Sequence, residues 1–194
     1  FAASPRVVTL PQLERLLDPD GPTDGQLLIE GSVPRTVAFI HCVGSRQIAG
    51  VDEPGPDGKL NTYCSRVCCT ATLQATNEVR RRMPDTAVYD LYRDIRTYEK
   101  AQEDYYVDAS KLGVRFLRFD NEARPLVSAT ESGDYPLIVR VNDTLTFGAE
   151  LEVPLGTREL RYLRGEILKV SIFARRPGSE DGAEFAVGCE FVRR

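Results

Sequence analysis

The chain has 194 residues, of which 42% are hydrophobic and 28% are charged, and its net charge is −4. This balance is typical of one globular domain, or of one domain with a small appendage. It argues against nucleic-acid binding, which calls for a basic surface. No apolar run reaches the roughly 18 residues of a membrane span, and no signal peptide is evident, so we expect a cytoplasmic protein. Because the chain begins with Phe1, we expect it to be a piece of a longer protein.

In chain order, residues 6–20 predict a short strand followed by a helix. Residues 36–43 are almost continuously apolar, which is typical of a strand that is buried on both faces. Residues 47–61 contain two prolines and three glycines and predict an exposed loop. Residues 65–82 predict a helix that ends before Pro84. The first third of the chain therefore carries one long loop between a buried strand and a helix.

Residues 87–92, 99–112 and 114–119 predict a strand, a helix and a strand. The resulting βαβαβ order, with short connections, predicts an α/β fold with a Rossmann-like, doubly wound parallel sheet. Residues 137–141 and 144–153 alternate apolar and polar side chains around Asn142 and Asp143, which indicates a β hairpin. Two further strands, within residues 166–174 and 183–192, are expected in a small C-terminal β appendage.

Four of the five cysteines lie within the first 69 residues of the chain. They are called the cysteine motif below: Cys42, Cys64, Cys68 and Cys69. Without a secretory signal, clustered cysteines favour metal binding or redox chemistry over a disulfide framework. The remaining Cys189 is expected to be a buried strand cysteine.

The cysteine motif places one thiol at the end of a buried strand and three at the start of a helix. Thiolates are the usual ligands of iron, and a cubane cluster needs four of them. The helix N-terminus, together with Arg46 and Arg66, could offset the negative charge of such a cluster. The spacing fits neither a zinc ribbon nor a compact ferredoxin run. Cluster binding is favoured, and zinc, a redox disulfide and buried structural cysteines stay open as alternatives.

Three other side chains could serve a site. His41 is the only histidine, and on a strand it points away from the face of Cys42, so a core position is expected. Arg93 and Arg96 follow the second strand of the predicted sheet, where dinucleotide folds bind ribose or phosphate. No glycine-rich cradle accompanies them, and we expect a structural or subunit-docking role. One histidine gives no Ser–His–Asp or Cys–His nucleophile, so no catalytic side chain is assigned.

Residues 37–46, 63–69 and 92–98 resemble, in this order, the A subunit of heterodisulfide reductase and its bacterial relatives. The resemblance runs from about residue 1 to residue 153. It is supported by three shorter segments, residues 21–25, 104–106 and 113–116.

The resemblance implies a thioredoxin-reductase-like core, of which this chain holds a part. Residues 1–35 would be the trailing segment of an FAD-type domain. Residues 36–153 would be the cluster-bearing, pyridine-nucleotide-type domain. Residues 154–194 would be a β appendage of unknown role, whose end weakly resembles the last strand of a PilZ-type barrel.

The resemblance also implies the function. The cysteine motif would hold a 4Fe–4S cluster that relays electrons between FAD and other redox centres, with other redox subunits as partners. Cofactor binding is assigned to four residues, Gly44, Ser45, Arg46 and Arg66. The Gly-x-Gly-x-x-Gly fingerprint for FAD is absent, so we expect FAD in the full-length protein only, and an oxidoreductase fragment that is not active alone. The alternatives are a cofactor-free Rossmann-like scaffold, a zinc-binding domain and a nucleotide-binding reductase domain.

Overall fold

The computed structural model describes residues 4–129, 137–143, 149–155, 161–162, 169–173 and 186–190. Three helices are present in these residues: α1 (Leu10–Leu17), α2 (Cys68–Arg82) and α3 (Gln102–Lys111). The strands are β1 (Thr36–Ile40), β2 (Ala87–Tyr92), β3 (Arg115–Arg118), β4 (Leu126–Ala129), β5 (Leu137–Asp143), β6 (Ala149–Leu155), β7 (Arg161–Tyr162), β8 (Lys169–Phe173) and β9 (Ala186–Glu190). Among the described helices, none combines the length and the apolarity needed to cross a membrane.

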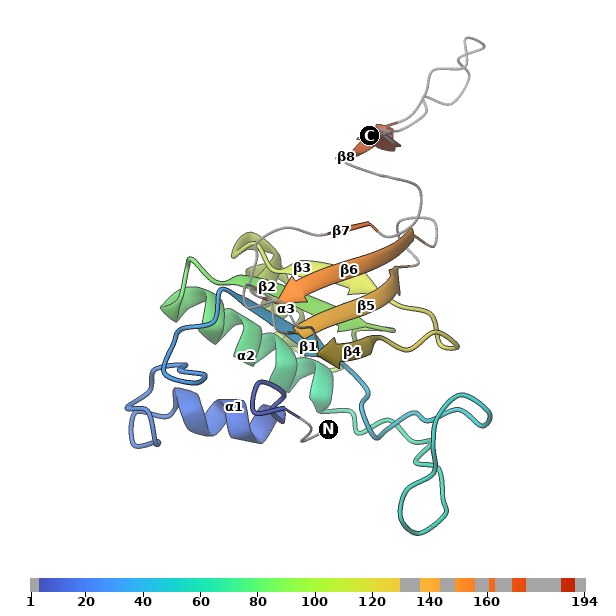
Figure 1. The fold of residues 1–194 in the computed structure, drawn as a ribbon, viewed down its shortest axis with the longest axis horizontal. Helices are drawn as coiled ribbons and strands as arrows, with labels where there is room; N and C mark the ends of the chain where they lie inside the picture. The colour runs from blue at the N-terminus through green and yellow to red at the C-terminus, as the bar shows by residue number, and fades with distance from the viewer. Residues whose placement is uncertain are drawn as a thin grey trace.

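The central layer is a parallel sheet with the strand order β1-β2-β3. The predicted βαβαβ order is therefore confirmed. Helices α2 and α3 lie on one face of this sheet, where Leu73, Val79 and Ala109 pack against Phe39 and Val88. Helix α1 lies beside α2 in the same layer (Figure 1).

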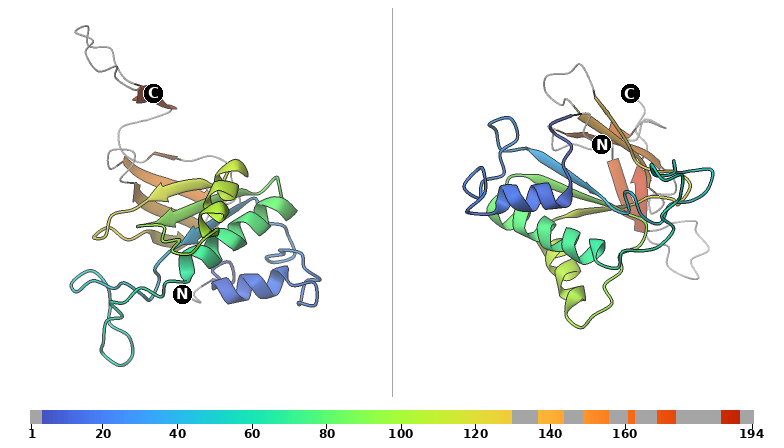
Figure 2. Two further views of the ribbon diagram at one scale, coloured as in Figure 1. Left: turned by 180° about the vertical axis from the view of Figure 1, so that it is seen from behind. Right: turned by 90° about the horizontal axis from the view of Figure 1, so that it is seen from below.

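An antiparallel sheet with the order β4-β5-β6-β7 covers the other face. Tyr89, Leu91 and Leu117 of the parallel sheet pack against Val139 and Val141 of β5. Figure 2 shows the helices and the strands β5 and β6 on opposite sides of the parallel sheet. The α/β class is confirmed, but the doubly wound arrangement is wrong for the described residues. Strands that follow one another in sequence order keep their crossover helices on one face, whereas double winding needs a reversal of strand order.

The hairpin of β5 and β6 is confirmed as an antiparallel pair. Its turn is not where the sequence predicts it, because Asn142 and Asp143 stay in β5, opposite Glu150 and Ala149. The connection that follows Asp143 lies outside the described residues. The two strands expected near the C-terminal end are present as β8 and β9, and they pair in the antiparallel direction. Cys189 belongs to β9, and its side chain lies outside the described residues.

Helix α1 begins at Leu10, and residues 7–9, where the sequence predicts a short strand, are not part of a strand. Thr9 caps the helix, because its hydroxyl accepts a hydrogen bond from the Gln12 amide while the Gln12 side chain accepts one from the Thr9 amide. The predicted strand at residues 7–9 is therefore wrong. The far end of α1 is tied to α2 by Arg82, whose Nη1 donates to Leu17 O at 2.5 Å. The N-terminal segment thus packs on the same helix that carries two of the cysteines.

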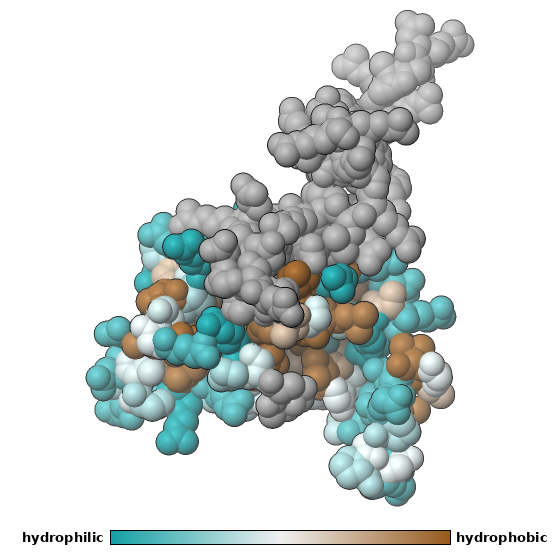
Figure 3. Space-filling model, in the orientation of Figure 1, coloured by the Kyte–Doolittle hydropathy of each residue, from teal (hydrophilic) through white to brown (hydrophobic). Residues whose placement is uncertain are grey.

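Hydrophobic surface is exposed on the face seen in Figure 1. In Figure 3, brown side chains gather over the centre of this face between hydrophilic margins. The exposed apolar residues of β4 are Leu126 and Val127. This strand lies at the edge of the antiparallel sheet, next to β5.

Candidate metal centre

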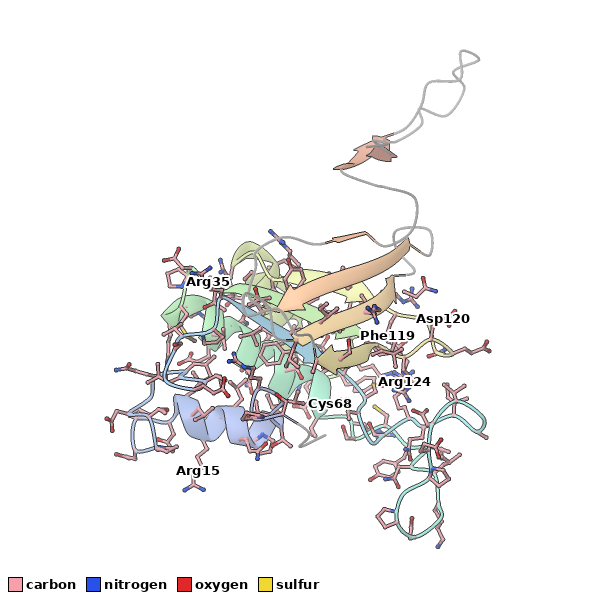
Figure 4. The ribbon with its side chains drawn as sticks, viewed as in Figure 1. Arg15, Arg35, Cys68, Phe119, Asp120 and Arg124 are labelled. Carbon is pink, nitrogen blue, oxygen red and sulfur yellow. The ribbon has the colours of Figure 1, made fainter. Side chains whose placement is uncertain are left out.

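The cysteine motif lies where the end of β1 meets the start of α2. Cys42 follows β1 by two residues, and its backbone is in the left-handed region at φ +60°. Cys68 and Cys69 are the first two residues of α2. The helix starts three residues later than the sequence predicts, because Arg66 also adopts a left-handed conformation at φ +64°. Figure 4 shows Cys68 at the end of α2 that faces the region of Arg124.

Three of the four cysteines are in contact through their thiols. Hydrogen bonding from Cys42, and then from Cys69, lowers the pKa of the Cys68 thiol. The same bond raises the pKa of Cys42, and burial adds to that effect. Hydrogen bonding with Cys68, followed by burial, also raises the pKa of Cys69. The shifts of all three pKa values therefore have a shared cause, which is the contact of Cys68 with the other two thiols.

Cys64 lies at the margin of this group. Its sulfur accepts a hydrogen bond from the Arg66 amide at 3.4 Å, and its side chain is half-buried. It lines an open cleft of about 1000 Å³, along with Tyr63, Val67 and Tyr98. These three neighbours are all more than 60% exposed. Of the four predicted ligands, Cys64 is the one that lines this cleft.

The thiols are not arranged as a finished site for a single ion. Within the residues that the structure describes, no three Cys, His, Asp or Glu side chains are spaced as ligands around one metal ion. A cubane cluster makes a different demand, because its four thiolates bind an assembly of iron and sulfide. The donor set fits such a cluster: three thiols in contact, a fourth at the margin, and a helix N-terminus beside them.

Two arginines hold the Cys42 end of the motif. Arg46 Nη1 lies 3.8 Å from Cys42 Sγ, and its Nη2 lies 2.9 Å from Asp94 Oδ2. Arg124 Nη1 donates to Cys42 O at 3.3 Å, while its Nη2 lies 2.6 Å from Asp52 Oδ2. Both arginine side chains are largely buried. The sequence indicated Arg46, but nothing in it indicated Arg124, which is 82 residues from Cys42.

The other predicted cofactor residues have different positions. Gly44, at φ +74°, and Ser45 form a turn after Cys42, in which the Ser45 amide donates to Cys42 O at 3.4 Å. Arg66 is exposed, and its backbone amide is what contacts the motif. The structure thus brings Arg46 to a cysteine sulfur through its side chain and Arg66 through its backbone amide, whereas Gly44 and Ser45 shape the turn that follows Cys42.

The loop between Cys42 and Cys64 is closed at its neck. The Arg46 amide donates to Tyr63 O at 3.0 Å, and the Gln47 amide donates to Asn61 O at 2.9 Å. The Asn61 amide returns a hydrogen bond to the Gln47 side chain at 2.7 Å. Beyond this neck, the loop projects from the body of the protein (Figure 1). The neck therefore brings the two ends of a long exposed segment together.

His41 is fully buried, as expected for a core position, and has an acidic partner that sequence reasoning missed. His41 Nε2 lies 2.8 Å from Asp90 Oδ1, and both side chains are inaccessible to solvent. The approach is close, although its angle is poor for a hydrogen bond. Burial lowers the pKa of His41, but the charge of Asp90, with a smaller effect of Cys68, outweighs it, so the pKa is raised. The sequence signal for this partner was Asp90, which is the one carboxylate in the otherwise largely apolar strand at residues 87–92.

Arg93 was expected to be structural or to dock a subunit. It is only 3% exposed, and its Nη2 donates to Arg46 O at 2.8 Å. Its interior position supports the structural role. Arg96 lies nearer the surface, 2.9 Å from Asp94 Oδ2.

No family model matches the chain. It is 41% identical over 150 residues to an iron–sulfur A subunit of the CoB–CoM heterodisulfide reductase of Methanopyrus kandleri, a match that covers 76% of this chain and 21% of the relative. It is 40% identical over 174 residues to the A subunit of the H(2):CoB–CoM heterodisulfide,ferredoxin reductase of Methanothermobacter marburgensis, covering 82% of this chain and 24% of the relative. It is 39% identical over 143 residues to the iron–sulfur A subunit of the CoB–CoM heterodisulfide reductase of Methanocaldococcus jannaschii. This match covers 72% of this chain and 20% of the relative. The chain spans about a fifth of the length of these relatives.

Proposed function

Because the chain is a homologue of the A subunits of heterodisulfide reductases and corresponds to about a fifth of their length, we propose that it is their cluster-bearing electron-transfer segment. The cysteine motif would hold a 4Fe–4S cluster. The single observation that carries this proposal is the contact of Cys68 with both Cys42 and Cys69 at the junction of β1 and α2. A cluster of this kind supplies one-electron transfer when it is bound.

The residues of this chain have separate tasks in the proposal. Cys42 and Cys69 supply thiolates from a buried position, Cys68 supplies one from a half-buried position between them, and Cys64 supplies the fourth from the margin of the cleft. Arg46 places positive charge 3.8 Å from the Cys42 sulfur, and the N-terminus of α2 adds a partial positive charge. Gly44 and Ser45 shape the turn after Cys42, and the Arg66 amide donates to the Cys64 sulfur.

In the longer protein, we propose that the cluster relays electrons between FAD and other redox centres, and that other redox subunits are the partners. The names of relatives support this, because the first describes an iron–sulfur protein and the second describes part of a ferredoxin reductase. Residues 36–153 would be the cluster-bearing domain. Residues 1–35 and residues 154–194 would be the trailing FAD-type segment and the β appendage.

The proposal is tested by anaerobic reconstitution of the chain with iron and sulfide. About four iron and four sulfide per chain are expected, with the brown colour of a cubane cluster. Cys189→Ser is the matched control, because it removes a cysteine outside the motif and should leave the iron content unchanged. A colourless chain that binds one zinc ion, or equal iron in a chain with all four motif cysteines changed to serine, would overturn the proposal.

A further inference from the structure

Arg93 is a buried cation without an acidic partner. It follows β2 directly and is 3% exposed. Its Nη2 donates to Arg46 O at 2.8 Å, and its Nη1 lies 3.5 Å from the amide oxygen of Asn121. Its Nε has no hydrogen-bond partner among the described residues. Both groups that accept hydrogen bonds from its side chain are neutral.

The neighbouring arginines differ in this respect. Arg46 and Arg96 both lie 2.9 Å from Asp94 Oδ2, and Arg124 is paired with Asp52. In the described part of the chain, no carboxylate is within ion-pair distance of Arg93. Asp52 acts on it only as a weak, more distant charge.

A buried charge is costly unless an opposite charge compensates it. A thiolate at Cys42 would favour the charged form of Arg93, whereas the neighbouring cations Arg124 and Arg46 disfavour it, so a negatively charged centre at Cys42 would compensate this cation. Arg93 also holds the backbone of Arg46, whose side chain contacts the Cys42 sulfur. Both its charge and its hydrogen bond are therefore directed at the Cys42 end of the motif.

We propose that Arg93 is a positioning residue of the cysteine centre, which holds the Cys42–Arg46 turn in place and compensates negative charge on the bound cluster. The charge-compensating part rests on the proposed function. When the centre gains one electron from a reduced iron–sulfur or flavin donor, its negative charge grows by one and no covalent bond changes. A fixed buried cation favours this more negative state, so Arg93 raises the reduction potential.

The first measurement is an anaerobic redox titration of the reconstituted chain. Arg93→Gln should disfavour reduction about tenfold, which is a potential lower by about 59 mV for one electron. Arg93→Lys, which keeps the charge, should stay within about threefold of the unchanged chain. Arg81→Gln is the matched control, because it removes a half-exposed arginine at the far end of α2. Its reduction should also stay within about threefold of the unchanged chain. If the reduction potential of Arg93→Gln differs from that of the unchanged chain by no more than the Arg81→Gln potential does, charge compensation by Arg93 is overturned.

The second measurement needs no cluster, so it separates this inference from the proposed function. Amide hydrogen exchange across residues 42–47 of the cluster-free chain should be at least about tenfold faster in Arg93→Gln and unchanged in Arg81→Gln. Equal exchange in all chains overturns the positioning role. If the unchanged chain takes up no cluster, the proposed function fails, and the exchange rates still decide the positioning role. If Arg93→Gln does not fold, Arg93→Met replaces it, because methionine fills a similar buried space without a charge. The expected potential and exchange rates are the same as for Arg93→Gln.

Discussion

The two ends of the loop between Cys42 and Cys64 differ in how firmly the protein holds them. At the first end, Cys42 is buried and contacts Arg46, Arg124 and Cys68. At the second end, Cys64 is half-buried, is bonded to the amide of its neighbour Arg66, and faces an open cleft. The first end is built into the fold by contacts from distant segments. The second end is held to the first through the backbone hydrogen bond from Arg46 to Tyr63.

Exchange of each cysteine for serine is expected to give the largest effect and tests this difference directly. Cys42→Ser should reduce iron retention by more than about 100-fold. Loss of a residue that only supports a metal ligand typically lowers metal affinity by about 10- to 100-fold, and loss of a buried ligand should cost more. Cys64→Ser should reduce it less, because a serine oxygen or water can replace a ligand at an open margin. Iron bound per chain after dialysis against a chelator measures both. Equal losses at the two ends would remove the distinction between them.

The buried support behind the first end gives the next largest effect. Asp90→Asn should lower the free energy of unfolding by roughly 3 kcal/mol, because it leaves the buried His41 without its charge partner. Asp94→Asn is the matched control, since Asp94 is 38% exposed and its pairs with Arg46 and Arg96 lie nearer the surface. Asp94→Asn should lower the free energy of unfolding by less than about 1 kcal/mol. Urea unfolding of the cluster-free chains gives both values, and a smaller loss in the Asp90 variant than in the control would contradict the idea of buried support.

The pair of Asp52 and Arg124 gives the smallest effect, and it depends on pH. Burial would raise the pKa of Asp52, but hydrogen bonds from Arg124 and the Ile48 amide outweigh it, so the pKa is lowered. Its contribution to stability is therefore present above the unfolded value of about 3.9 and is lost as the pH falls through the lower folded value.

Asp52→Asn should accordingly lower the free energy of unfolding by about 1 kcal/mol at neutral pH. The difference from the unchanged chain should shrink below about pH 3.9. Tyr63→Ala, at the exposed second end, should change stability by less than about 0.5 kcal/mol at either pH. A constant difference across the acid range would show that the Asp52 charge is not what stabilises the turn.

The sequence predicted what local pattern and spacing can encode. The βαβαβ order is confirmed, and the strand expected at residues 36–43 is confirmed over Thr36–Ile40, because buried strands and amphipathic helices have their own periodicities. The left-handed backbone of Cys42 and Arg66 could not be predicted, since neither is the glycine that usually occupies that region.

Contacts between distant segments were the other limit. Arg124 reaches Cys42 from 82 residues away, and the antiparallel sheet that covers the parallel one is set by tertiary packing. The burial of Arg93 follows from the same packing, because an arginine after a strand is as compatible with an exposed loop as with the interior. Spacing therefore located the cysteines, and only the fold could show which charges surround them.

The closed neck of the loop has a consequence for how this site is recognised in other sequences. The hydrogen bonds from Arg46 to Tyr63 and from Gln47 to Asn61 set the distance between the loop ends, whatever the length between them. Lengthening a flexible loop is inexpensive, at about 0.6 kcal/mol for each doubling. The gap between the first and second cysteine is thus free to vary among related proteins. The interval from Cys64 to Cys69 is bound to the start of a helix, and it is the part of the pattern that a sequence search should hold constant.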